Sequence, residues 1–94
     1  MKAIWRFELP IVDCPVVDMP RGARVLNGPP SGRGDPDRIE IWAEVDVQEE
    51  AAPRAFRVVG TGGPMPGDCG RFVGTVLTHD GVYVWHLYEA CESA

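Results

Sequence analysis

Residues 39–47, which read IEIWAEVDV, carry the most regular hydrophobic alternation in the chain. Every odd position in this stretch is apolar, whereas the even positions hold Glu40, Trp42, Glu44 and Asp46. A period of two residues is typical of a β-strand that has one face in the core and the other toward solvent. The stretch therefore predicts a half-buried strand and indicates a β fold.

Shorter stretches elsewhere in the chain share this β character. Residues 3–9 alternate in the same way and end before Pro10, because proline lacks the N–H group that a strand ladder needs. Further strands are predicted at residues 14–19, 23–26 and 55–59, the first two as edge strands. Residues 48–53 predict a turn or a single helical turn.

Two stretches rich in Gly and Pro separate these segments. Residues 27–37 predict a flexible surface loop, because residues 27–36 hold no apolar side chain that could pack in a core. Residues 60–70 predict a second irregular connection. Neither loop divides the chain, so we expect residues 1–94 to form a single domain.

The last two strands are predicted to form a hairpin around Asp80-Gly81, a pair that supplies the positive φ angles of a type I′ turn. A two-residue turn fixes the register, and the predicted pairs are His79 with Val82, Leu77 with Val84, Thr75 with His86, Val73 with Tyr88, Val76 with Trp85, and Gly74 with Leu87. Both faces of this hairpin are largely apolar. The hairpin therefore lies in the middle of a barrel or sandwich, or commits one face to a partner.

The predicted fold is all-β: a small antiparallel sandwich or partly open barrel of five to seven short strands. Its apolar content, 45% of the residues, is sufficient for a packed core. The predicted core residues are Trp5, Phe7, Leu9, Ile39, Ile41, Val45, Phe56, Val58, Phe72, Val76, Trp85 and Leu87.

Charge and cysteine content exclude several classes of function. Nine basic and fourteen acidic residues give a net charge of −5, which argues against nucleic-acid binding because phosphates require clustered Lys and Arg. The first residues lack the long apolar run of a signal peptide or membrane span, so we expect no membrane association. Three widely spaced cysteines give no disulfide framework, which favours a reducing cytoplasm.

The residues that could carry chemistry do not form a recognisable catalytic or metal-binding pattern. The Gly60–Gly70 loop resembles phosphate-binding loops only in its glycines, because no Walker lysine follows them. The spacing of His79 and His86 does not preassemble a metal site with Cys14 or Cys69. We therefore expect no enzymatic activity, no cofactor and no metal.

Two groups of residues are candidate contacts for a partner protein. Trp42 shares a strand face with Glu40 and Glu44, so its indole is either covered by a loop or by Arg side chains, or serves as a binding anchor. Val73 and Tyr88 are predicted to form a second patch on the final hairpin. The acidic surroundings favour a partner with a basic or mixed apolar face.

Several segments resemble a family of small uncharacterised bacteriophage and prophage proteins, especially those of actinobacteriophages. The segments are MKAIWRFEL at 1–9, MPRGA at 19–23, FRVVGTG at 56–62, PMP at 64–66, FVGT at 72–75 and VWHL at 84–87. The resemblance implies a phage-encoded accessory protein in the cytoplasm of the host bacterium. It transfers no catalytic or ligand-binding residue.

The leading functional expectation is a non-enzymatic protein that binds a host bacterial protein and modulates it, in host growth or division, superinfection exclusion or counter-defence. One alternative is a small-molecule or nucleotide binder that uses the Gly60–Gly70 loop. Another is a self-assembling structural protein, in which the two-sided apolar hairpin pairs with a copy of itself to give a homodimer.

Overall fold

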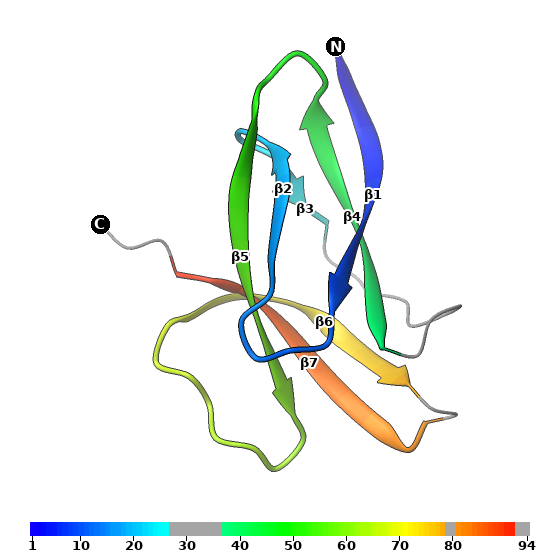
Figure 1. Ribbon diagram of the computed structural model, residues 1–94, viewed down its shortest axis with the longest axis vertical. Coiled ribbons are helices and arrows are strands. Elements are labelled where there is room, and N and C mark those ends of the chain that lie inside the picture. Colours follow the sequence, from blue (N-terminus) through cyan, green and yellow to red (C-terminus); the bar gives the residue numbers. More distant parts are fainter. Residues whose placement is uncertain (27–36, 79–80, 92–94) are drawn as a thin grey trace.

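The two halves of the fold are antiparallel β-sheets that pack face to face as a sandwich (Figure 1). The computed structural model describes residues 1–26, 37–78 and 81–91, and these ranges form seven strands and no helix. The strands are β1 (Lys2–Pro10), β2 (Val16–Pro20), β3 (Arg24–Val25), β4 (Arg38–Asp46), β5 (Ala51–Gly60), β6 (Cys69–Thr78) and β7 (Tyr83–Ala90). One sheet has the order β1-β4-β3 and the other β2-β5-β7-β6. The predicted all-β sandwich is confirmed.

The alternating stretch that defined the sequence pattern forms β4, the central strand of the three-stranded sheet. Its odd residues from Ile39 to Val45 are buried, and they face a core that includes Leu9 from β1 and Phe56 from β5. One buried hydrophobic cluster therefore joins both sheets. Burial of these side chains is the main contribution to stability in a domain of this size.

β5 begins earlier than the sequence indicated. The segment predicted as a turn over 48–53 already contains the first residues of β5, which starts at Ala51. Pro53 is tolerated in β5 because its nitrogen, which carries no hydrogen, does not face β2. The pairing of β5 with β2 shows this, since the Phe56 N–H donates to the Pro15 carbonyl at 2.9 Å. The even residues of β5 thus direct their backbone N–H and C=O groups toward β2. The nitrogen of Pro53 points to the opposite side of β5, where β7 has not yet begun to pair.

The two predicted edge strands are confirmed as β2 and β3, which lie at the edges of different sheets. The second Gly/Pro-rich segment connects β5 to β6, and Gly62 adopts a φ of 88° that favours glycine. Of the loop predicted at 27–37, only Asp37 is described, and its carbonyl accepts the Ile11 N–H at 3.0 Å. Residues 27–36 lie outside the described part of the chain.

The hairpin register follows the prediction near its turn and departs from it farther away. Thr75 pairs with His86 and Leu77 with Val84, as expected, and Gly81 has a φ of 84°. The predicted pairing of His79 with Val82 involves a residue outside the described ranges. The predicted pairing of Val73 with Tyr88 is wrong: Tyr88 pairs with Phe72, because an irregularity between Phe72 and Gly74 inserts one extra residue into β6.

This bulge exchanges the faces of two neighbouring side chains. Val73 is 3% exposed and belongs to the core, whereas Phe72, predicted in the core, is 48% exposed. Trp5, also predicted in the core, is 42% exposed. Phe7 and Trp85 are partly buried and pack against the core, and the other predicted core residues are buried: Leu9, Ile39, Ile41, Val45, Phe56, Val58, Val76 and Leu87.

Candidate protein-binding surfaces

The five predicted contact residues lie in three different places. Trp42, Glu40 and Glu44 lie on the outer face of the three-stranded sheet, since they alternate with the buried residues of β4. Tyr88 lies on the outer face of the four-stranded sheet, next to fully buried Leu87. Val73 lies in the core and presents no side chain to a partner. The outer faces of a sandwich point in opposite directions, so Trp42 and Tyr88 do not form one patch.

Charged pairs cover the outer face of the three-stranded sheet. Trp42 is half-buried and lies directly opposite Arg6 of β1. The guanidinium of Arg6 donates from Nη1 to Glu8 at 2.7 Å and to Glu40 at 3.0 Å. The bond to Glu8 is the main reason that the pKa of Arg6 is raised above its usual value, and the bond to Glu40 adds to it.

The carboxylate of Glu44 continues this network. It lies 3.8 Å from Lys2 Nζ and 3.3 Å from Arg24 Nη2, while Glu40 is only 5% exposed. The charges that surround the Trp42 indole are therefore compensated within the chain. A partner protein would have to compete with these ion pairs to reach the carboxylates.

Apolar side chains are more accessible on the outer face of the four-stranded sheet. The rings of Phe72 and Tyr88 pack against each other with centroids 5.3 Å apart at an angle of 60°. Leu77, on the same face of β6, is 58% exposed. We call the outward residues of the final hairpin the hairpin surface; they are Phe72, Thr75, Leu77, Val84, His86 and Tyr88.

His86 fixes the middle of the hairpin surface. Its Nε2 lies 2.8 Å from the Thr61 hydroxyl and its Nδ1 lies 3.0 Å from the Thr75 hydroxyl. A neutral imidazole donates from one nitrogen and accepts at the other, and a threonine hydroxyl suits either role. His86 therefore ties the β5–β6 loop to the hairpin.

An ion pair fixes the other end of the β5–β6 loop. Arg57 Nε donates to both carboxylate oxygens of Asp68 at 3.0 Å, and Nη2 also donates to Asp68. The hydrogen bonds from Arg57 hold the pKa of the Asp68 carboxyl below its usual value. Since Arg57 lies opposite Tyr88 on the neighbouring strand, this pair borders the hairpin surface.

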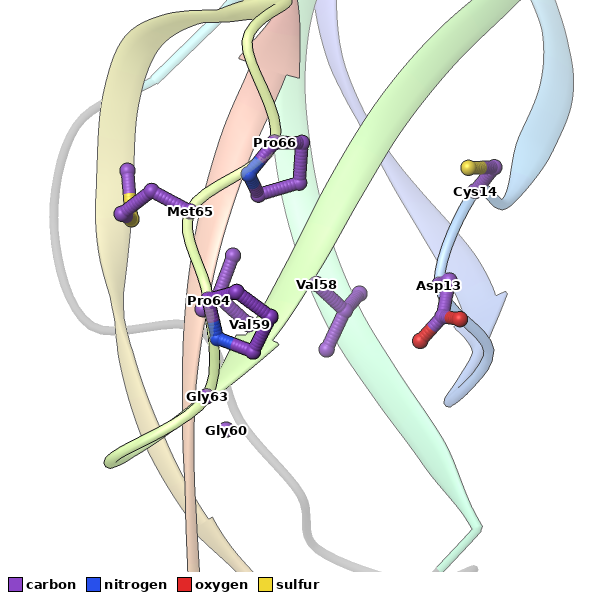
Figure 2. Close-up of a pocket in the computed structure, with 9 residues that line it drawn as sticks. All are labelled: Asp13, Cys14, Val58, Val59, Gly60, Gly63, Pro64, Met65 and Pro66. Carbon is purple, nitrogen blue, oxygen red and sulfur yellow. The ribbon is translucent and has the colours of Figure 1, made fainter.

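A pocket of about 430 Å³ lies between this loop and the loop that follows β1 (Figure 2). Asp13 and Cys14 line one side, and Gly63 to Pro66 line the other, with Val58 between them; Val59 also contributes to the lining. Most of the lining is apolar, and Asp13 is the one charged residue among the described residues that form it. The described part of the lining thus offers a carboxylate and no cation to a ligand.

The histidine and cysteine side chains considered as metal ligands or reactive groups do not form a site in the described part of the chain. Among the described residues, no cluster of three His, Cys, Asp or Glu side chains could hold a metal ion, and His79 lies outside those residues. Burial raises the pKa of the Cys69 thiol, and the nearby Asp68 raises it further. The thiol of Cys69 therefore stays protonated at neutral pH.

The described ranges contain no helix long and apolar enough to cross a membrane.

Phe72 is the exposed aromatic residue that sequence reasoning assigned to the wrong face. Adjacent apolar residues Phe72 and Val73 break the alternation of β6, and glycines flank them at positions 70 and 74. A glycine inside a strand pattern often marks a bulge. This local signal could have identified the change of face.

Comparison with known proteins gives the family. No curated protein and no solved structure matches the chain. A family model described as Domain of unknown function (DUF7352) matches residues 1–94, the whole length. The chain, an all-β domain, therefore belongs to the family of domains of unknown function DUF7352.

Proposed function

We propose that this protein is a non-enzymatic, phage-encoded accessory protein that binds a host bacterial protein in the cytoplasm and modulates its activity. The observation that carries the proposal is the hairpin surface, where exposed Phe72 packs against Tyr88 and exposed Leu77 lies farther along the same face, opposite Val84. Aromatic side chains supply much of the binding energy at protein interfaces.

The outer position of the hairpin supports this choice. The sequence left two alternatives for its apolar faces, complete enclosure or contact with a partner. One face packs in the core through Val76 and Leu87, and β6 forms an edge of its sheet. On the second face Phe72 and Leu77 are exposed, as expected for a surface that binds a partner.

The internal hydrogen bonds favour a preorganised contact. Thr61 and Thr75 fix His86, and Asp68 fixes Arg57 beside Tyr88. Side chains that are already ordered lose less conformational entropy on binding. With a net charge of −5 on the chain, the matching partner surface is apolar with a basic rim.

The direct test is affinity capture from bacterial host lysate, followed by binding measurements with the purified prey. We expect one abundant prey, and we expect Phe72→Ala to weaken its binding about tenfold or more, the typical effect of removing an aromatic hot spot. Val12→Ala is the matched control, because Val12 is 51% exposed but lies outside the hairpin.

Trp42→Ala tests the other face in the same experiment. If Trp42→Ala abolishes capture while Phe72→Ala and Val12→Ala retain it, the contact lies on the three-stranded sheet. Circular dichroism and thermal melting of each variant separate a lost contact from a lost fold. A capture that no variant alters would contradict binding through either face.

The pocket supports a second candidate function, the binding of a small apolar molecule. The residues described in its lining are mostly apolar and include Asp13 but no cation, so an uncharged or cationic ligand fits better than a nucleotide phosphate. A ligand that binds the folded state raises the melting temperature. The test is a melting screen of nucleotides and small apolar compounds, with Val59→Trp as the variant that fills the pocket.

A further inference from the structure

β1 is the least protected edge strand of the sandwich. The edge strands are β1 and β3 in one sheet and β2 and β6 in the other. β3 has two residues, β2 has five and ends in Pro20, and β6 is interrupted by register shifts. These features discourage pairing with another chain, whereas β1 has nine residues and pairs with β4 without a break.

The backbone groups at the free edge of β1 follow from its pairing with β4. Val47 N–H donates to the Met1 carbonyl at 3.0 Å, so the odd residues of β1 form the hydrogen-bonded pairs with β4. The even residues therefore direct their N–H and C=O groups away from the sheet. Ile4, at the centre of this free edge, is 63% exposed.

We propose that β1 pairs antiparallel with β1 of a second copy of this chain, with Trp5 at the two-fold axis. In this register Lys2 lies opposite Glu8 of the second copy, and the symmetry repeats the pair. Ile4 lies opposite Arg6 of the second copy. The two three-stranded sheets become one continuous sheet, and the interface is isologous.

The pairing of opposite charges and the missing N–H group of Pro10 together select this register. The long registers in which even residues face each other are centred on Trp5, Arg6 or Phe7. Centring on Arg6 places two Arg6 side chains opposite each other, and centring on Phe7 places Pro10, which lacks an N–H group, in the ladder. Only the Trp5 register pairs opposite charges and uses every outward N–H group that it covers.

The side chains at the free edge are available for this contact. The exposed fractions are 73% for Lys2, 49% for Arg6 and 45% for Glu8. Trp5 faces the core side of the sheet but is 42% exposed on the edge strand β1. At the two-fold axis the two indoles would pack against each other and remove this apolar surface from water.

The inference is tested by sedimentation equilibrium of the full chain and of two charge-reversal variants. We expect the wild-type chain to dimerise. Lys2→Glu creates two Glu–Glu pairs in the homodimer, and Glu8→Lys creates two Lys–Lys pairs, so each variant should dimerise about tenfold more weakly. An equimolar mixture should form heterodimers near wild-type affinity, because both of its charge pairs are again of opposite sign.

The rescue by mixing separates the contact from effects inside one chain. Lys2 also lies near Glu44, and Glu8 also binds Arg6, but damage to those pairs would persist in the mixture. A monomeric wild-type chain at high concentration, or a mixture no stronger than its components, would overturn the proposal.

Phe72→Ala serves as the control and should leave dimerisation unchanged, since Phe72 lies on the other sheet. If Phe72→Ala abolished dimerisation, the hairpin would be the self-association surface and the β1 register would be wrong. The dimer does not depend on partner capture: loss of capture with intact dimerisation, or the reverse, would count against only one of the two proposals.

Discussion

Phe56 and Phe72 belong to neighbouring parts of one sheet but face opposite sides. Phe56 is completely buried in the core, and Phe72 is 48% exposed beside Tyr88. Since both residues are phenylalanine, substituting each of them compares the contribution of this side chain in the core with its contribution at the surface.

We predict that Phe56→Ala lowers the free energy of unfolding by about 3–5 kcal/mol, because it removes buried apolar surface and leaves a cavity. Phe72→Ala should cost about 1 kcal/mol or less, since half of its ring already contacts water. Chemical denaturation of both variants measures the difference. Equal losses of the free energy of unfolding in the two variants would place Phe72 in the core and contradict the bulge in β6.

The Arg57–Asp68 ion pair gives a residue-scale prediction about pH. The pKa of Asp68 is lowered in the folded protein, chiefly by hydrogen bonds from Arg57, so its contribution to stability is present above the unfolded pKa of about 3.9. The contribution is lost as the pH falls through the folded pKa. Asp68→Asn should therefore melt below wild type at pH 7 and converge with it at strongly acidic pH.

Melting temperatures across this pH range test the prediction, with Asp18→Asn as the control, because Asp18 is an exposed residue of β2. A difference between wild type and Asp68→Asn that stays constant down to the lowest pH would show that the variant acts through packing rather than through its charge.

At the scale of elements, β6 shows where sequence reasoning succeeds and where it ends. The Asp80-Gly81 signal fixed the register as far as Gly74, because each cross-strand pair follows from the turn by simple counting. Beyond Gly74 the counting failed, since a bulge inserts a residue into β6 and counting from the turn takes no account of it. The faces of β4 were predicted from its sequence alone, because its strict alternation of apolar and other residues matches the burial of its side chains.

Gly70, near the start of β6, provides a prediction for this irregular part of the strand. An added Cβ at Gly70 would lie 2.9 Å from the Glu89 carbonyl oxygen, too close without a shift of the backbone. Gly70→Ala should therefore lower the free energy of unfolding by about 1–3 kcal/mol.

Gly67→Ala is the matched control, since nothing lies within 4 Å of the added carbon there. Urea denaturation of both variants measures the effect. Equal stability of the two alanine variants would show that the approach of β6 to β7 at Gly70 is not close.

At the scale of the whole molecule, alternation and turn signals predicted the sandwich, but they did not predict how its surfaces are arranged. The sequence grouped Trp42 and Tyr88 as candidate contacts, and the structure places them on opposite outer faces. Which strands share a sheet is decided by long-range packing, and no local pattern records it. Trp5 was misassigned for the same reason, because the position of β1 at a sheet edge, where Trp5 is 42% exposed, cannot be read from local alternation.

The proposed dimer contact and the proposed partner-binding surface lie on different sheets. The β1 edge belongs to the three-stranded sheet and the hairpin surface to the four-stranded sheet. A dimer formed through β1 leaves both hairpin surfaces accessible, so it would present two partner sites and raise the apparent affinity for an oligomeric partner.

The most direct test of partner binding through the hairpin surface is an NMR titration of the isotope-labelled protein with its purified prey. We predict that amide shift changes concentrate in β6 and β7 around Phe72, Leu77 and Tyr88, with little change around Trp42. Changes confined to the outer face of β4, around Trp42 and Glu44, would contradict the account.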